Sequence, residues 1–243
     1  MFTLISPLRP VHWSGMVLMT QGFGENRVDF YSKMGLKGHN GIDLFTRHYD
    51  QGHAPVYASH DGYVISNATI QSNTAGRFVK LLSDEMEIDN RACKVLTIYF
   101  HLLKANVSST DKTDSATYWK KPGERYVVAG QTIGYTNNTG EYTTGAHLHF
   151  GVYILWNRAN GSFTADTTNG FDGAVDPIVY LRDGNVYLLP MSFTNNYYHD
   201  GKSISNKEAN NAIPAHLKAE ASSWSTRVWK ANLFLRSLMG IKQ

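Results

Sequence analysis

The sequence of 243 residues predicts a mainly β protein, an antiparallel β-sheet sandwich or open barrel, with a helical appendage at its C-terminal end. Short apolar runs bounded by Gly, Asn, Asp and Pro clusters recur between residues 17 and 155, which is typical of strands. Few segments before residue 200 have the 3.6-residue periodicity of an amphipathic helix. An apolar stripe with spacings of three and four beyond residue 216 predicts the one helix.

The strands are expected in the following order. The first covers residues 17–19 and leads into a glycine-rich turn that ends at Gly24. Six more are expected at residues 40–46, 55–66, 76–82, 94–102, 126–129 and 146–155. The segment 106–121 is polar and longer than most connections, so we expect an exposed loop there.

The composition changes along the chain and indicates three parts. We expect a β domain at residues 1–182, an extension with a polar linker at 183–213, and an amphipathic helix at 214–240. The stripe of the helix consists of Leu217, Ala221, Trp224, Val228, Ala231, Leu235 and Leu238. Three roles remain open for it: packing on its own domain, self-association or partner contact through 217–238, and lying on a membrane surface. We expect residues 1–190 to fold without it.

Composition excludes several classes of protein. The net charge of +3 is small and no Lys/Arg cluster alternates with aromatic residues, so we expect no nucleic-acid partner. No apolar stretch is long enough for a transmembrane segment, and the first residues lack the basic region of a signal peptide. The single cysteine, Cys93, excludes an intramolecular disulfide framework and a cysteine-based metal site.

Two short polar motifs stand out. His39 and Asp43 are four residues apart, and His147 and His149 are two apart. Even spacing places side chains on one face of a strand. The alternate residues then point into a core: Ile42, Leu44, Leu148, Phe150 and Val152. Two imidazoles and a carboxylate from two strands make a three-ligand zinc site with one open position, which is typical of catalytic zinc.

A hydrolytic zinc site also needs a residue that moves protons. The H-E-x-x-H helix with its glutamate base is absent. His101 ends an alternating strand, which predicts that it shares a face with Thr97 and Tyr99, while the intervening residues turn inward: Leu96, Ile98, Phe100 and Leu102. Of His147 and His149, one would bind metal and the other would reach the water, because histidine suits acid–base work near neutral pH.

Five separated segments resemble the M23 (lysostaphin/LytM-type) zinc metallopeptidases, in the order found in that family. They are residues 38–44, 54–64, 99–102, 128–135 and 144–151, and the resemblance extends over roughly residues 18–182. It implies that His39, Asp43 and His149 are the zinc ligands. It also implies that His101 and His147 handle the water and the transition-state charge, and it makes Tyr31 a candidate to help hold the oxyanion.

The resemblance further implies a function. It predicts an endopeptidase with one catalytic Zn²⁺ that cleaves peptide cross-links of bacterial peptidoglycan, in a groove walled by loops near 24–38, 66–76, 106–123 and 136–145. A phage-type or secreted lysin would fit, acting at the cell wall from a virion or through a membrane lesion. Two alternatives remain: a non-catalytic binding or activator module, and a virion structural component with an accessory peptidase domain.

Overall fold

The computed structural model describes residues 2–9, 16–26, 30–46, 53–72, 75–105, 126–141, 143, 145–181, 187–190, 196–199 and 202–205. Within these residues the chain forms one mainly antiparallel sheet that does not close, which confirms the predicted fold class. The predicted helix at 214–240 and the loop at 106–121 lie outside the described residues. No helix in the described part is long and apolar enough to cross a membrane.

The strands of the sheet fall into a central set and two flanks. The central strands, in spatial order, are β2 (Ile42–Phe45), β10 (His147–Asn157), β7 (Arg91–Ala105), β5 (Gly76–Leu82), β4 (Gly62–Ser72) and β8 (Tyr126–Val127). Beyond β2 come β1 (Met16–Gln21), β13 (Tyr187–Pro190), β14 (Asn196–His199) and β15 (Lys202–Ser205). The pair β1–β13 is parallel. The last three strands lie in the segment that the sequence predicts as extension and linker.

The remaining elements attach to this order. β3 (Pro55–Tyr57) pairs with β9 (Thr132–Thr136), and β9 also pairs with the end of β7. Short strands add to the long central ones: β6 (Met86–Ile88), β11 (Phe163–Thr164) and β12 (Ala174–Val175). Three single-turn 3-10 helices complete the described chain: η1 (Tyr31–Met34), η4 (Thr167–Asn169) and η5 (Pro177–Val179).

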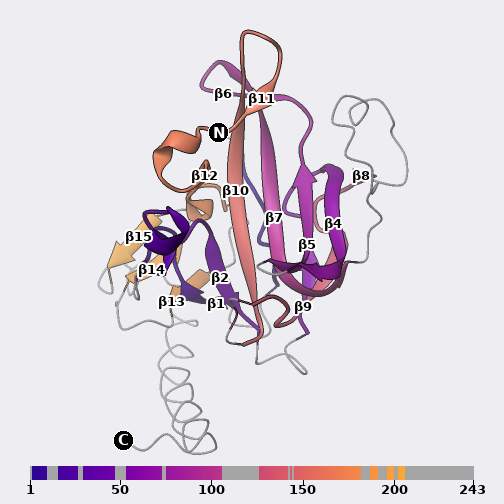
Figure 1. Cartoon of the computed structure of the whole chain (residues 1–243), viewed down its shortest axis with the longest axis vertical. Coiled ribbons are helices and arrows are strands. Elements are labelled where there is room, and N and C mark those ends of the chain that lie inside the picture. Colours follow the sequence, from indigo (N-terminus) through magenta and orange to yellow (C-terminus); the bar gives the residue numbers. More distant parts are fainter. Residues whose placement is uncertain are drawn as a thin grey trace, which may run out of the picture.

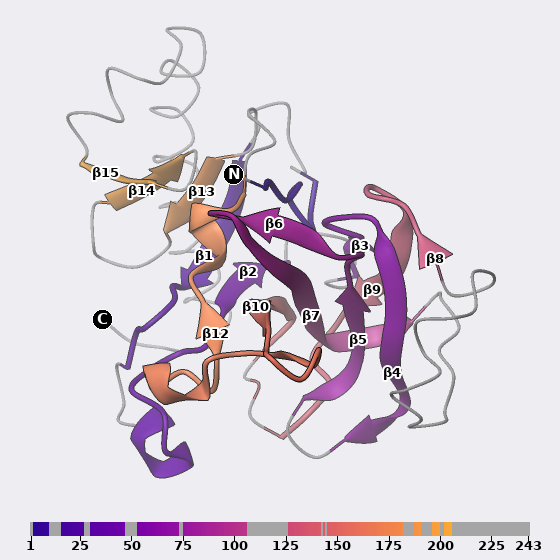
Figure 2. The same cartoon turned by 90° about the horizontal axis from the view of Figure 1, so that it is seen from above.

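The core packs along the central strands β10 and β7. β10 and β7 run side by side along the molecule (Figure 1). Figure 2, from above, shows the twist of the sheet and β3 beside β9. The fully buried residues come from the central strands, from β3 and β9, and from the N-terminal segment, and include Leu4, Leu8, Ile42, Leu44, Val56, Ile133, Leu148, Phe150 and Val152. The predicted inward residues of the two histidine motifs are therefore confirmed.

The predicted orientation of β7 is wrong at several residues. Thr97 and Tyr99 are buried, and Tyr99 belongs to the core cluster. Its hydroxyl accepts hydrogen bonds from Ser59 N (2.9 Å) and Thr97 Oγ1 (3.0 Å), so this polar group is satisfied inside the core. Phe100 instead stacks on His149, with ring centroids 5.4 Å apart.

A β-bulge explains how His101 differs from the alternation of its strand. β7 pairs Tyr99 with Val79 and Leu102 with Arg77, so Phe100 and His101 together oppose the single residue Phe78. The extra residue shifts the alternation by one, and Leu102 returns to the core as predicted.

Other strands differ from the prediction in extent. The segment 55–66 is not one strand, because the chain leaves β3 after Tyr57 and begins β4 at Gly62. Ala58 and Ser59 donate their N–H groups to Gln131 O and to Tyr99, so the break is held by partners distant in sequence. The strands β6, β9, β11 and β12 were not predicted, and each is five residues or shorter.

Candidate functional site

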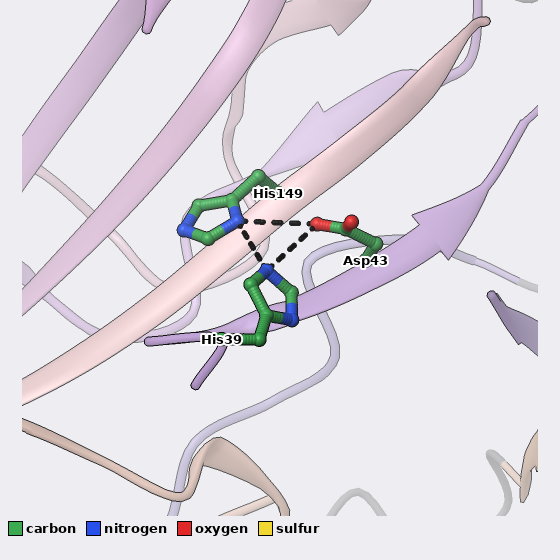
Figure 3. Close-up of side chains that lie close together, drawn as sticks. All are labelled: His39, Asp43 and His149. Atoms are coloured by element: carbon green, nitrogen blue, oxygen red, sulfur yellow. Dashed lines mark hydrogen bonds and ion pairs between the residues drawn. The ribbon is translucent and has the colours of Figure 1, made fainter. Parts of the chain in front are cut away.

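Three side chains converge where β2 and β10 lie side by side (Figure 3). His149 on β10 is paired directly with Asp43 on β2, and their Nδ1 and Oδ1 atoms are 3.1 Å apart. His39 lies just before β2, and its Nε2 is 2.9 Å from His149 Nδ1 and 3.3 Å from Asp43 Oδ1. The register of one antiparallel pair thus joins two motifs that are more than 100 residues apart.

A backbone carbonyl sets the orientation of His39. Its Nδ1 lies 3.1 Å from Gly22 O in a buried position, and because a carbonyl only accepts, Nδ1 carries the proton. Nε2 is then left with its lone pair directed at Asp43 and His149. This is the arrangement in which a second partner fixes the tautomer of a metal-ligating histidine.

Burial and neighbouring charges determine the protonation of the other two donors. Burial lowers the pKa of His149, which keeps the imidazole neutral at neutral pH. Burial acts to raise the pKa of Asp43, but its interactions with the neighbouring imidazoles of His39, His149 and His147 outweigh burial and hold that pKa well below its usual value. Asp43 is therefore an ionised carboxylate beside a neutral imidazole. Carboxylates and histidines bind metal in these protonation states.

The donor set fits zinc. Nitrogen and oxygen ligands bind Zn²⁺ at about 2.0–2.2 Å, so a tetrahedral site places neighbouring donors about 3.3–3.6 Å apart. The three observed separations, from 2.9 to 3.3 Å, approach that spacing. Within the described part of the chain this is the one group of three or more His, Cys, Asp or Glu side chains arranged to hold a metal ion. The structure therefore brings together the three residues that the resemblance assigned as ligands.

The two further predicted histidines lie beside this group. The rings of His101 and His147 have centroids 4.7 Å apart, and His147 Nε2 is 3.8 Å from Asp43 Oδ1. His101 Nδ1 donates to Thr139 O (2.8 Å), and His147 Nδ1 donates to Gly145 O (2.7 Å). In both rings the proton is therefore on Nδ1 and Nε2 remains basic.

His101 is neutral at neutral pH for a physical reason. Burial lowers its pKa to about 4, the charges of His147 and His149 act in the same direction, and the hydrogen bond to Thr139 offsets only part of the shift. A neutral imidazole with a free Nε2 is able to accept a proton.

Tyr31, the predicted oxyanion helper, also lies at the site. Its ring centroid is 5.4 Å from that of His39, and its hydroxyl donates to Gln21 Oε1 (3.2 Å). Burial, and then the charge of Asp43, raise the pKa of Tyr31, so the phenol keeps its proton and remains a hydrogen-bond donor. The position is compatible with the predicted role, which remains a prediction.

Several groups at the site were not found from the sequence. The carbonyls of Gly22, Thr139 and Gly145 orient three histidine rings, and backbone carbonyls have no sequence signal. Phe100 was missed because strict alternation put it in the core. Of the loops expected to wall a groove, 24–38 supplies Tyr31 and 136–145 supplies Thr139 and Gly145, whereas 106–123 lies outside the described residues.

Comparison with known proteins gives one family match and several similar solved structures. The sequence profile of Peptidase family M23 matches residues 37–162, more than half of the 243 residues. No match to the chain is found among curated proteins. Similar solved structures include the catalytic domain of the antimicrobial peptidase lysostaphin from Staphylococcus simulans (25% identity, 66% of this chain and 88% of that chain, TM-score 0.43).

Two further solved structures are similar over comparable lengths of this chain. LytU has 27% identity, and the match covers 68% of this chain and 87% of that chain with a TM-score of 0.42. A zinc-containing peptidase from Vibrio cholerae has 22% identity, and the match covers 72% of this chain but 40% of that chain, with a TM-score of 0.43.

Proposed function

The chain belongs to peptidase family M23, and from this premise we propose that it is a zinc-dependent endopeptidase that hydrolyses peptide cross-links of bacterial peptidoglycan. The observation that carries the proposal is the convergence of His39 Nε2, Asp43 Oδ1 and His149 Nδ1. Peptidoglycan as the substrate rests on membership of the family.

The residues divide the work as follows. His39, Asp43 and His149 would hold the zinc, which would act as a Lewis acid toward a peptide carbonyl and would lower the pKa of a water to about 7. His101, neutral with its proton on Nδ1, accepts a proton at Nε2 while Thr139 O holds the ring in place. His147 provides a second Nε2 beside Asp43, at which a proton is taken up or released.

Tyr31 completes the site as a neutral donor. To reach the developing oxyanion, its hydroxyl would give up the hydrogen bond to Gln21, so we expect Tyr31 to contribute to the transition state rather than to metal binding.

Digestion of purified cell walls tests the proposal. Walls that carry glycine bridges and walls with direct diaminopimelate links are incubated with zinc-loaded protein, with chelator-treated protein and with the chelated protein after zinc is restored. Mass spectrometry of the fragments should show new peptide termini in the first and third samples only. If no wall of either type yields new termini with zinc-loaded protein, the proposal is wrong.

Zinc content separates this function from a non-catalytic binding module. All five metal-site and histidine positions are present and brought together, which supports the enzyme. Freshly purified protein without zinc, and without activity after zinc is added, would favour the binding module.

We further propose that the protein acts at the cell wall, either from a virion or through a membrane lesion, and co-purification with particles tests the first route.

A further inference from the structure

His101 adopts a backbone conformation that an ordinary strand residue avoids. Its φ is 64°, in the left-handed region, although it lies inside the fifteen-residue strand β7. The other described non-glycine residues with positive φ are all Asp or Asn: Asp89, Asn90 and Asp172. Such a conformation is unfavourable for a residue with a Cβ atom and persists only where the surroundings hold it.

Two loops take over the main-chain hydrogen bonds of His101. Its N–H donates to Ala75 O (3.0 Å), and its carbonyl accepts from Asn137 N (3.0 Å). The bulge is therefore held by segments outside the β5–β7 ladder, one of which is the segment 137–139.

Thr139 makes three contacts around the bulge. Its carbonyl accepts from His101 Nδ1 (2.8 Å). Its hydroxyl donates to Leu102 O (2.8 Å) and accepts from Arg77 N (2.9 Å). Arg77 and Leu102 are the cross-strand pair next to the bulge, so one side chain bridges both strands at that point.

Packing leaves Thr139 little freedom to move. It is only 8% exposed. A Cβ atom on Gly76, the residue before Arg77, would overlap the carbonyl group of Thr139, so the two main chains are in direct contact. The hydroxyl and the carbonyl of Thr139 are thus set by the same buried contacts.

We propose that Thr139 is a positioning residue for His101. Its hydroxyl joins the two strands beside the bulge through Arg77 N and Leu102 O, and its carbonyl orients the ring so that Nδ1 carries the proton and Nε2 remains basic. This inference rests on the proposed function, in which His101 accepts a proton. It assigns to Thr139 the geometry of the base and no contact with metal or substrate.

Variants at Thr139 test this positioning role. Thr139→Val replaces the hydroxyl by a methyl group, so it keeps the branched shape and removes both hydrogen bonds of the hydroxyl. Thr139→Ala removes the hydroxyl and the γ-methyl group together, so it adds no apolar atom in place of the oxygen. Both should lower kcat on a soluble cross-link peptide by roughly ten- to a hundredfold, because small displacements of a catalytic group cost that much. KM and zinc content should stay unchanged. Thr139→Ser keeps the hydroxyl and should restore most of kcat.

Thr136→Val is the matched control. Thr136 is also buried, at the end of β9 just before the segment 137–139, and its hydroxyl accepts from Ala54 N (2.8 Å). The variant should be less stable than wild type, but at assay temperatures well below its melting temperature it should have the wild-type kcat. A kcat of Thr139→Val equal to that of wild type, or an equal fall of kcat in Thr136→Val, overturns the proposal.

Nitrogen NMR of the His101 ring gives a reading independent of activity. In zinc-loaded wild-type protein, long-range ¹H–¹⁵N spectra should show the proton on Nδ1; a proton on Nε2 overturns the proposal even if neither hydroxyl-free variant folds. Thr139→Val should show a mixture of tautomers and Thr139→Ser the wild-type form. If wild-type protein cuts no cross-link, the proposed function is wrong, and the NMR spectra still show whether Thr139 positions the His101 ring.

Discussion

At the residue scale, three histidines have the same tautomer for the same reason. His39, His101 and His147 each donate Nδ1–H to a backbone carbonyl, and each is thereby left with an unprotonated Nε2. His149 differs, since its Nδ1 faces Asp43 and His39. The contrast follows from position, because His149 stands on the strand opposite Asp43 and reaches it with the nearer ring nitrogen.

The first prediction separates metal ligands from proton carriers. Alanine at His39, Asp43 or His149 should lower zinc affinity by more than about a hundredfold, since second-sphere changes alone cost about 10–100-fold. His101→Ala and His147→Ala should keep zinc and lose turnover by about 10²–10⁴-fold. Competition with a zinc chelator and peptide kinetics measure the two effects. The assignment is wrong if His101→Ala loses zinc while Asp43→Ala retains it.

The second prediction concerns acid stability of the metal-free protein. The pKa of His101 is about 4 in the fold and about 6.5 in an unfolded chain. Between these values the unfolded chain binds a proton that the folded protein does not, so stability decreases as pH falls. The contribution of neutral His101 to the free energy of unfolding is fully present above pH 6.5. On the order of 3 kcal/mol of that free energy is lost by pH 4. His149, also shifted downward, acts in the same direction.

Urea unfolding with chelator at pH 7, 5.5 and 4.5 measures this loss. His101→Gln does not titrate and should show a smaller loss than wild type over the same range. Asp43, whose pKa is lowered, would contribute its own loss only below about pH 4, outside the window. Equal losses in the two proteins would contradict the assignment.

At the element scale, close approach of β10 to the start of β2 places His149. A Cβ atom on Gly41 would lie 2.7 Å from Phe150 O and 2.8 Å from the His149 ring. Only glycine fits there without displacing His149, the proposed metal ligand. The glycine in the His-x-x-x-Asp motif therefore has a structural reason.

The third prediction follows from this contact. Gly41→Ala should displace His149 and lower zinc affinity by roughly tenfold or more, comparable with loss of a supporting partner. Gly161→Ala is the control: this glycine has φ 78° with no atom within 4 Å of an added Cβ, so the variant should lose stability and keep zinc. Calorimetric zinc titration of both variants is the measurement, and wild-type affinity in Gly41→Ala would contradict the contact.

At the scale of the whole molecule, the described core and the site are both formed by residues up to Leu181. Among the residues whose burial is described, the core cluster extends from Leu4 to Leu181. The three short strands β13, β14 and β15 extend the sheet from β1 up to Ser205. The predicted helix at 214–240 lies outside the described residues.

The fourth prediction is that deletion of residues 206–243 leaves a folded, zinc-binding protein. Its melting temperature should change by less than about 4 °C, equivalent to roughly 1 kcal/mol for a chain of this size. Activity on intact walls, targeting or oligomeric state should change more than activity on a small soluble peptide. An insoluble or unfolded product would mean that the helix belongs to the core.

The sequence by itself determined the β class, most long strands, and the two motifs that converge at the site, because alternation and ligand spacing are local properties of an extended chain. Only the tertiary structure decided the pairing of Asp43 with His149, the bulge that turns His101 out of the alternation, and the carbonyls that select each tautomer. These features depend on partners tens of residues away, such as Thr139 for His101, and a period-two pattern contains no information about such partners.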